Sequence, residues 1–118
     1  MKWTVVQLGP FVNRWKSERL SDEDLQALES DIMENPFAGA VMKETGGLRK
    51  MRFAPPSRGK GKSGSMRIGY AQFPEFETLF LITMFLKKDD ANLSRGDRHT
   101  IKAWIKQIAD DLKKGRRP

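Results

Sequence analysis

The sequence contains no cysteine, a single histidine and a single tyrosine among its 118 residues. Without cysteine the chain forms no disulfide and offers no thiolate as nucleophile or metal ligand. One histidine, His99, is too few for a histidine-rich catalytic metal site, and we expect it on the surface of the last helix. The acidic pairs Asp89-Asp90 and Glu75/Glu77 are only local, so carboxylate-pair hydrolysis of glycosides has no support.

Long hydrophobic runs are also missing. The longest apolar run, Leu79–Leu86 with Thr83 inside it, is far shorter than the roughly 20 residues that span a bilayer as a helix. The first residues, MKWTVVQLG, lack the hydrophobic region and the small-residue cleavage site of a signal peptide. We therefore expect a cytoplasmic protein without a membrane partner, and the absence of cysteine fits a reducing compartment.

Positive charge, by contrast, is abundant and concentrated. The stretch Lys43–Arg67 holds eight basic residues and one acid, so its net charge of +7 equals that of the whole chain. The rest of the sequence therefore sums to zero. A basic stretch of this kind, in a chain with a pI near 9.9, favours a polyanion such as nucleic acid as partner.

Hydrophobic periodicity and turn residues predict one α+β domain over residues 1–118. The expected order is β-α-α-β-β-β-α, with a mainly antiparallel sheet packed against helices. The expected elements are a strand Trp3–Leu8, a short helix after Pro10, a helix from Ser21 to about Asn35, strands Leu48–Phe53, Met66–Phe73 and Thr78–Leu86, and a helix after Ser94.

Details of the helices follow from their side chains. Ser21 and Asp24 have the spacing of a capping box, and the acids of that helix, Asp24 among them, are expected on a solvated outer face. The last helix has an apolar stripe expected to face the core: Ile101, Trp104, Ile105, Ile108 and Leu112. The basic tail, residues 113–118, is expected to be frayed.

Two stretches between these elements are expected to lack regular structure. Asn35–Gly47 is interpreted as a connection, and Ser57–Gly64 as a mobile basic loop.

The basic residues suit RNA cleavage without a metal. In that reaction the 2′-hydroxyl attacks the adjacent phosphate, and the site supplies a base, an acid and positive charge for the phosphorane. Arginine stays protonated and clamps the phosphate, whereas clustering lowers the pKa of a lysine toward the range of proton transfer. Lys50 and Arg52, two residues apart, share one strand face. Arg67 can lie across from them on the next strand, and Lys87 follows the last strand.

Three stretches, GGLRKMRF, SRGKGKSGSMRIGYAQF and LFLITMFLKKDDANLS, resemble the HigB-like branch of the RelE/ParE toxin superfamily. The upstream stretch LSDEDLQALESDIMENPFAG is also similar to that branch, so the resemblance covers roughly residues 11–110. It implies a RelE-like fold and the toxin of a type II toxin–antitoxin system. Such toxins cleave mRNA in the ribosomal A site and are held inactive by a cognate antitoxin, often one with a helix-turn-helix DNA-binding domain. We expect no metal and no cofactor.

The resemblance also implies roles for individual residues. By motif position the catalytic residues are Lys50, Arg52, Arg67 and Lys87, and the expected RNA contacts are Arg49, Arg58, Lys60, Lys62, Phe85 and Lys88. Some family members use a tyrosine near the end of the last strand, where this sequence has Phe85. A phenylalanine ring can stack on a base but cannot transfer a proton. Tyr70 lies one strand earlier and is expected in the core.

Two other interpretations remain at this point. A ParE-like toxin of the same fold would bind and inhibit gyrase without cutting RNA, although that branch usually lacks the full basic set on its strands. A nucleic-acid-binding module without chemistry would show strongly salt-dependent binding and no cleaved product. All three interpretations predict binding to polyanions, so binding alone does not separate them.

Overall fold

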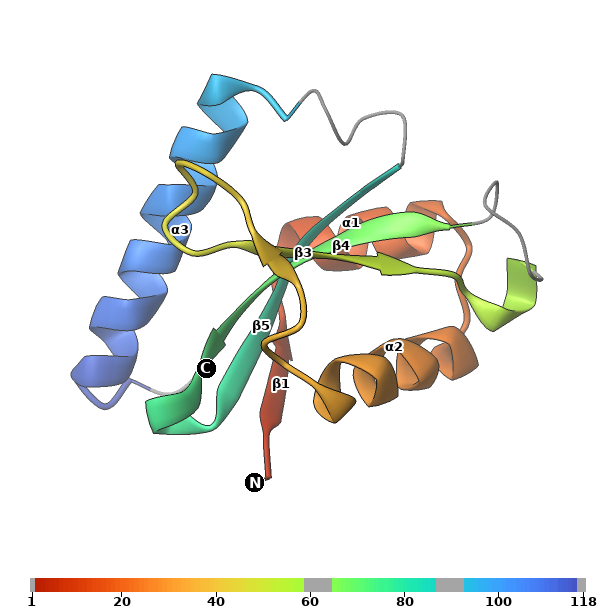
Figure 1. Cartoon of the computed structure of the whole chain (residues 1–118), viewed down its shortest axis with the longest axis horizontal. Coiled ribbons are helices and arrows are strands. Elements are labelled where there is room, and N and C mark those ends of the chain that lie inside the picture. Colours follow the sequence, from red (N-terminus) through yellow and green to blue (C-terminus); the bar gives the residue numbers. More distant parts are fainter. Residues whose placement is uncertain (1, 59–64, 87–92, 117–118) are drawn as a thin grey trace.

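A mixed sheet forms the centre of the molecule (Figure 1). The computed structural model describes residues 2–58, 65–86 and 93–116. These residues form a five-stranded sheet in the spatial order β1-β5-β4-β3-β2, three α-helices and two short 3-10 helices. The elements are β1 (Thr4–Gln7), α1 (Gly9–Ser17), α2 (Asp22–Glu34), β2 (Ala40–Val41), β3 (Arg49–Phe53), η1 (Pro56–Arg58), β4 (Met66–Phe73), η3 (Pro74–Phe76), β5 (Thr78–Leu86) and α3 (Arg95–Lys113).

Strands β3, β4 and β5 follow one another along the chain and pair antiparallel, which confirms the predicted antiparallel arrangement. β1 runs parallel to β5, so the first strand lies beside the last one. The predicted element order lacks β2, which pairs antiparallel with β3 inside the segment expected to be a connection. Two residues are too few to show a period of two, so the pattern gave no sign of this strand.

The sheet lies between two hydrophobic clusters. α1 and α2 pack against one side through Phe11, Trp15, Leu28 and Ile32. α3 packs against the other side through Ile101, Ile105 and Leu112. Because successive residues of a strand point to opposite faces, each interior strand contributes side chains to both clusters.

Strand β5 is buried on both faces, as its apolar run predicts. Its pairing with β4 is interrupted, because Gly69 pairs with Thr83 whereas Tyr70 pairs with Leu81. Ile82 therefore has no residue opposite it on β4, which makes a β-bulge. The bulge divides the β4–β5 pair into the part beside β1 and the part that carries the basic residues discussed below.

Helix α2 begins with the predicted capping box. The Ser21 hydroxyl oxygen accepts a hydrogen bond from the Asp24 backbone N–H at 3.1 Å, and an Asp24 carboxylate oxygen accepts one from the Ser21 N–H at 3.0 Å. The expectation that Asp24 lies on the solvated outer face is wrong, because this carboxylate is fully buried.

Helix α3 begins after Ser94, as predicted, and the Ser94 hydroxyl accepts a hydrogen bond from the Asp97 N–H at 2.9 Å. The expectation that Trp104 belongs to the buried stripe is wrong. Its side chain is 36% exposed, because position 104 falls at the edge of the face that meets the sheet.

The end of α3 is more ordered than its basic composition suggests. Gly115 has a φ of +75°, and its N–H donates to the carbonyl of Leu112 at 3.1 Å. The N–H of Arg116 donates to the carbonyl of Asp111 at 2.8 Å, which completes a Schellman motif. Residues 113–116 therefore form a hydrogen-bonded helix end, and the expected fraying of the tail stays a prediction. Residues 117–118 lie outside the described part of the chain.

Candidate nucleic-acid interface

Three of the four predicted catalytic residues lie together on one face of the sheet. Arg52 of β3 stands directly opposite Arg67 of β4, and Lys50 stands opposite Gly69. Directly opposite residues of antiparallel strands have Cβ atoms about 4.5–5.5 Å apart, and diagonal neighbours such as Lys50 and Arg67 are roughly 7–8 Å apart. Leu48, two residues before Lys50, belongs to the cluster under α3, so the three cations continue the face that α3 covers.

This arrangement favours an anion. Arg52 is exposed, and Lys50 and Arg67 are half-buried and interact with neighbouring groups. Like charges directly opposite on paired strands repel each other and destabilise a sheet. A phosphate between Arg52 and Arg67 would offset that repulsion and would accept charge-assisted hydrogen bonds from two planar guanidinium groups. Lys50 would then lie beside the same phosphate as a third positive charge.

Arg49, a predicted RNA contact, lies on the opposite face of β3. Its Nε donates to the side-chain oxygen of Gln72 at 3.2 Å, and its Nη1 donates to the carbonyls of Phe37 at 2.9 Å and Gly39 at 2.7 Å. These contacts tie the segment before β2 to β3 and β4. Because protein acceptors hold Arg49 on the other side of the sheet, we do not assign it to RNA.

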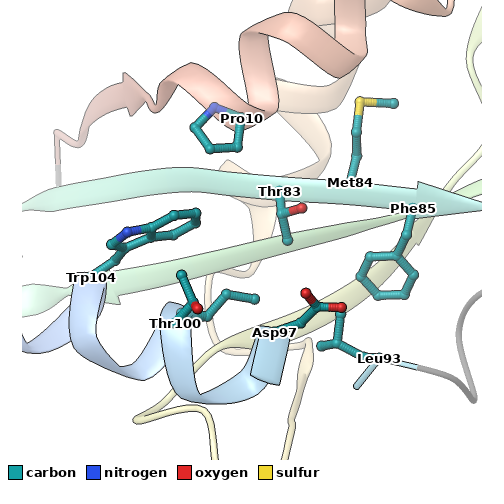
Figure 2. A pocket seen from close by; sticks show the side chains of 9 residues that line it. Pro10, Thr83, Met84, Phe85, Leu93, Asp97, Thr100 and Trp104 are labelled. Atoms are coloured by element: carbon teal, nitrogen blue, oxygen red, sulfur yellow. The ribbon is translucent and has the colours of Figure 1, made fainter. Parts of the chain in front are cut away.

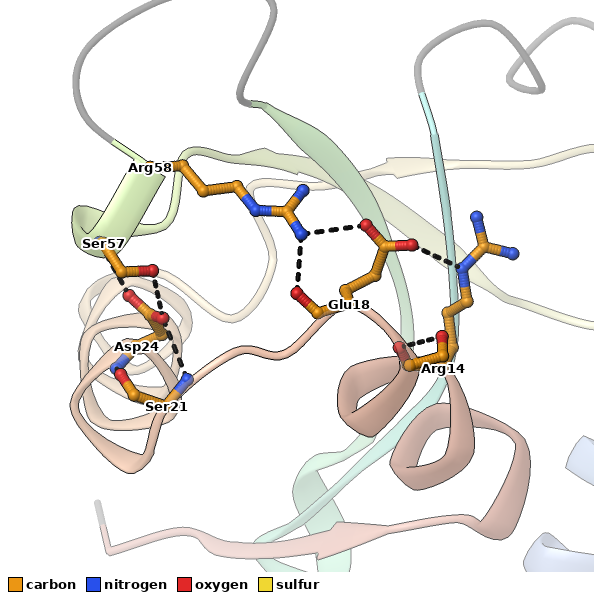
Figure 3. Close-up of polar contacts among 7 residues, drawn as sticks. Arg14, Glu18, Ser21, Asp24, Ser57 and Arg58 are labelled. Carbon is orange, nitrogen blue, oxygen red and sulfur yellow. Dashed lines mark hydrogen bonds and ion pairs between the residues drawn. The ribbon is translucent and has the colours of Figure 1, made fainter.

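Arg58, a second predicted RNA contact, is also engaged within the protein. Its Nη2 donates to the Glu18 carbonyl at 2.7 Å and to the Glu18 carboxylate at 2.9 Å (Figure 3). Glu18 also forms an ion pair with Arg14, at 3.5 Å. Arg58 thus fixes η1 to the end of α1, and we do not assign it to RNA.

The base of the predicted mobile loop is held by Asp24. The Asp24 carboxylate accepts hydrogen bonds from the Ser57 N–H at 3.0 Å and from the Ser57 hydroxyl at 2.6 Å, as Figure 3 shows. Ser57 and Arg58 therefore belong to a 3-10 helix, and the expectation that they lack regular structure is wrong. Residues 59–64 lie outside the described residues.

The same contacts change the acidity of Asp24. Burial acts to raise the pKa of this carboxyl, but the hydrogen bonds from Ser57 and Ser21 outweigh it, and the pKa is lowered from its ordinary value. The carboxylate is therefore charged at neutral pH and accepts hydrogen bonds from both serines. This charge joins the start of α2 to the segment that follows β3.

Phe85, predicted to stack on a base, is only 7% exposed and belongs to the hydrophobic cluster under α3. It stands opposite Arg67 and lines a hollow of about 420 Å³ between β5 and the first turns of α1 and α3. In Figure 2, Phe85 and Thr83 point from β5 toward α3, whereas Met84 points toward α1. A ring packed in this way is not free to stack, so we place Phe85 in the core.

Four further predicted residues, Lys60, Lys62, Lys87 and Lys88, lie outside the described residues. Tyr70 is buried, as predicted, and 1% exposed. Its hydroxyl donates to the carbonyl of Pro36 at 2.9 Å and accepts from the N–H of Gly39 at 3.1 Å. Within the described structure, the candidate site therefore consists of Lys50, Arg52 and Arg67.

Cations of α3 were overlooked in the sequence. Arg95, Arg98 and Lys102 follow one another at helical spacing and, with Glu44 and His99, line a hollow of about 450 Å³. The spacing of three and four residues was a usable signal for one helix face. It was missed because the apolar stripe of the same helix dominated the pattern.

Comparison with known proteins adds no family assignment: no model of a protein family matches the sequence. In the described ranges, no three His, Asp or Glu side chains are grouped so that they could hold a metal ion. None of the helices formed by these residues is long and apolar enough to cross a membrane.

Proposed function

We propose that this chain is the toxin of a type II toxin–antitoxin system, a RelE-like domain that cleaves mRNA on the ribosome without a metal. The observation that carries the proposal is the placement of Arg52 opposite Arg67, with Lys50 diagonal to Arg67 on the same face. The resemblance of the strand and loop segments to HigB-like toxins supports the same assignment. The cytoplasm, where ribosomes and mRNA are found, is the proposed location.

The proposed reaction is an internal transesterification. The 2′-oxygen forms a bond to the adjacent phosphorus, the bond from phosphorus to the 5′-oxygen breaks, and the products are a 2′,3′-cyclic phosphate and a 5′-hydroxyl. Arg52 and Arg67 clamp the phosphate and stabilise the charge that builds up on the phosphorane. Lys50 takes the proton of the 2′-hydroxyl, and Lys87 is proposed to protonate the leaving 5′-oxygen.

The proposed regulator is an antitoxin that covers the basic face. An acidic, amphipathic segment suits a surface with two opposed arginines, because it neutralises their repulsion while it blocks access of RNA. The antitoxin is proposed to carry a helix-turn-helix DNA-binding domain, as in the toxin–antitoxin family that the sequence resembles.

The test is to induce the chain in bacteria and to map mRNA 5′ ends. The wild type is compared with Lys50→Ala/Arg67→Ala, and with Lys16→Ala/Lys106→Ala, which removes two exposed cations elsewhere. We expect translation-dependent cuts with 5′-hydroxyl ends in the wild type and the control, and none in the first variant. The two removed groups act on one phosphate, so activity should fall by at least a hundredfold.

Other outcomes would indicate a different function. Growth arrest without cuts would indicate a gyrase-type inhibitor of the ParE kind. RNA binding with neither arrest nor cuts would indicate a nucleic-acid-binding module. Circular dichroism and urea unfolding of Lys50→Ala/Arg67→Ala test whether the variant is still folded, so that a loss of activity can be told apart from a loss of fold.

A further inference from the structure

The N-terminal half of helix α3 has its cations and its one acid, Asp97, on different sides. Arg95, Arg98 and Lys102 line the hollow on the side of the turn before β3, together with Glu44. Asp97 lines the other hollow, between α3 and β5, on the side of Trp104. The cations are therefore not spread around a solvated helix but gathered on one side, next to a concave surface.

Arg98 is held in place within this hollow. Its Nε donates to the carbonyl of Leu93 at 3.0 Å, and its Nη1 donates to the carbonyl of Lys43 at 2.8 Å. A guanidinium carries five N–H donors, and these bonds use two of them. The group is thus oriented by the fold while it keeps donors for a further acceptor, which lowers the entropy lost when an anion binds.

A smaller hollow connects Arg98 to Lys50 of β3. It measures about 250 Å³ and is lined by Lys43, Lys50, Arg98 and the residues of β2. Arg98 belongs to both hollows, and Lys50 belongs to the candidate catalytic set. Two hollows that share Arg98 therefore link Lys50 of β3 and the turn that includes Lys43 to the N-terminal half of α3.

We propose that this surface is a second RNA-backbone site, in which Arg95, Arg98 and Lys102 bind phosphodiesters beyond the scissile phosphate. The proposal rests on the proposed function in taking RNA as the polyanion. Among the residues that the structure describes, Glu44 is the one acid that lines the hollow. Its charge opposes the phosphates and sets the affinity below what the cations alone would give.

The site is tested by RNA binding in the non-cleaving Lys50→Ala/Arg67→Ala background. Arg95→Gln/Lys102→Gln removes two cations of the hollow, and glutamine keeps most of the Lys102 stem that lies against Gly46. Lys106→Gln/Lys113→Gln removes the same charge from exposed positions of α3 outside the hollow. Fluorescence anisotropy is measured with a labelled single-stranded RNA and a labelled RNA hairpin over a series of salt concentrations.

We expect the hollow variant to lower the slope of log affinity against log salt by about 1.4 on the single strand, the value for two lost phosphate contacts. The control variant should change this slope much less. Glu44→Gln, made in the same Lys50→Ala/Arg67→Ala background, should bind RNA more tightly than that background alone. Loss on the single strand identifies a messenger-like ligand. Loss confined to the hairpin identifies a folded, ribosomal-type ligand, and either result supports the site.

Equal losses in the hollow and control variants, on both RNAs, would overturn the second site. This outcome is independent of the nuclease. If the wild type never cuts mRNA but Arg95→Gln/Lys102→Gln loses more RNA affinity than the control, the second site stands and only the proposed reaction is refuted. If the wild type cuts mRNA but the two double variants lose RNA affinity equally, the proposed reaction stands and only the second site is refuted.

Discussion

At the scale of single residues, Tyr70 shows how one side chain positions a segment without taking part in chemistry. Its hydroxyl bridges the carbonyl of Pro36 and the N–H of Gly39 within the core. A Cβ at position 39 would lie 2.7 Å from that oxygen, so only glycine allows the approach. The buried phenol therefore holds the chain that leads into β2, next to the strand that carries Lys50.

Tyr70→Phe should lower the free energy of unfolding by about 1–3 kcal/mol. The change leaves the Pro36 carbonyl and the Gly39 N–H without their buried partner, and such groups are expensive to leave unsatisfied. Urea unfolding measures the loss, and mRNA cleavage should persist at a temperature where the variant is folded. A variant of wild-type stability without cleavage would instead give Tyr70 a role in the reaction.

At the scale of elements, Asp24 joins two parts of the chain that are far apart in sequence. It caps α2 through Ser21 and holds η1 through Ser57, which follows β3. One carboxylate thus fixes both the first turn of a helix and the base of the basic loop. The hydrogen bonds that Asp24 accepts stabilise the fold most when its carboxyl group is ionised.

The pH dependence follows from the lowered pKa of Asp24. A carboxyl whose pKa is lower in the folded state stabilises the fold fully above its unfolded pKa, near 3.9, and loses that contribution as pH falls further. Asp24→Asn should therefore cost about 1–3 kcal/mol at pH 7. The difference in the free energy of unfolding between Asp24→Asn and the wild type should become smaller below about pH 4.

Urea unfolding between pH 3 and 7 measures this gap. Asp22→Asn serves as the matched control, because it removes one acid from an exposed position of the same helical turn. A gap that stays constant across this range would show that the ionised carboxylate does not hold η1.

At the scale of the whole molecule, the basic stretch of the sequence is divided among different tasks. Arg49 and Arg58 bind protein acceptors, whereas Lys50, Arg52 and Arg67 share one face of the sheet. Crowding like charges on that face opposes folding, as is common where a site is built for a ligand of opposite charge. The cations of α3 extend the same face onto a helix.

Arg52→Gln should raise the free energy of unfolding by a few tenths of a kcal/mol at low salt, because it relieves the repulsion with Arg67. The advantage should shrink as salt screens the charges of the wild type. RNA affinity should fall in the same variant. Urea unfolding at two salt concentrations, with Lys106→Gln as control, measures the effect. A destabilised Arg52→Gln would show that the two arginines do not repel each other in the fold.

Much of the architecture was accessible from local patterns. The capping box at Ser21, the apolar run of β5 and the alternation in β3 and β4 each depend on neighbours within a few residues, so periodicity and cap chemistry predicted them. The i and i+2 spacing of Lys50 and Arg52 placed both on one face for the same reason. The short β2 escaped because it exists only through its pairing with β3.

The register between strands was decided by the tertiary structure alone. The direct opposition of Arg52 and Arg67 depends on which residues of β3 and β4 pair. The far face of Arg49 already follows from the alternation of side chains along β3, but its hydrogen bonds to the carbonyls of Phe37 and Gly39 depend on packing. The burial of Asp24 and the capture of Arg58 by Glu18 depend on contacts 33 and 40 residues apart along the chain. The sequence by itself determined that this protein is basic, with a net charge of +7 concentrated in the stretch Lys43–Arg67. Which basic residues meet across β3 and β4, and which bind acceptors within the protein as Arg58 does, depended on long-range packing, because strand register and tertiary contacts join residues that are far apart in the chain.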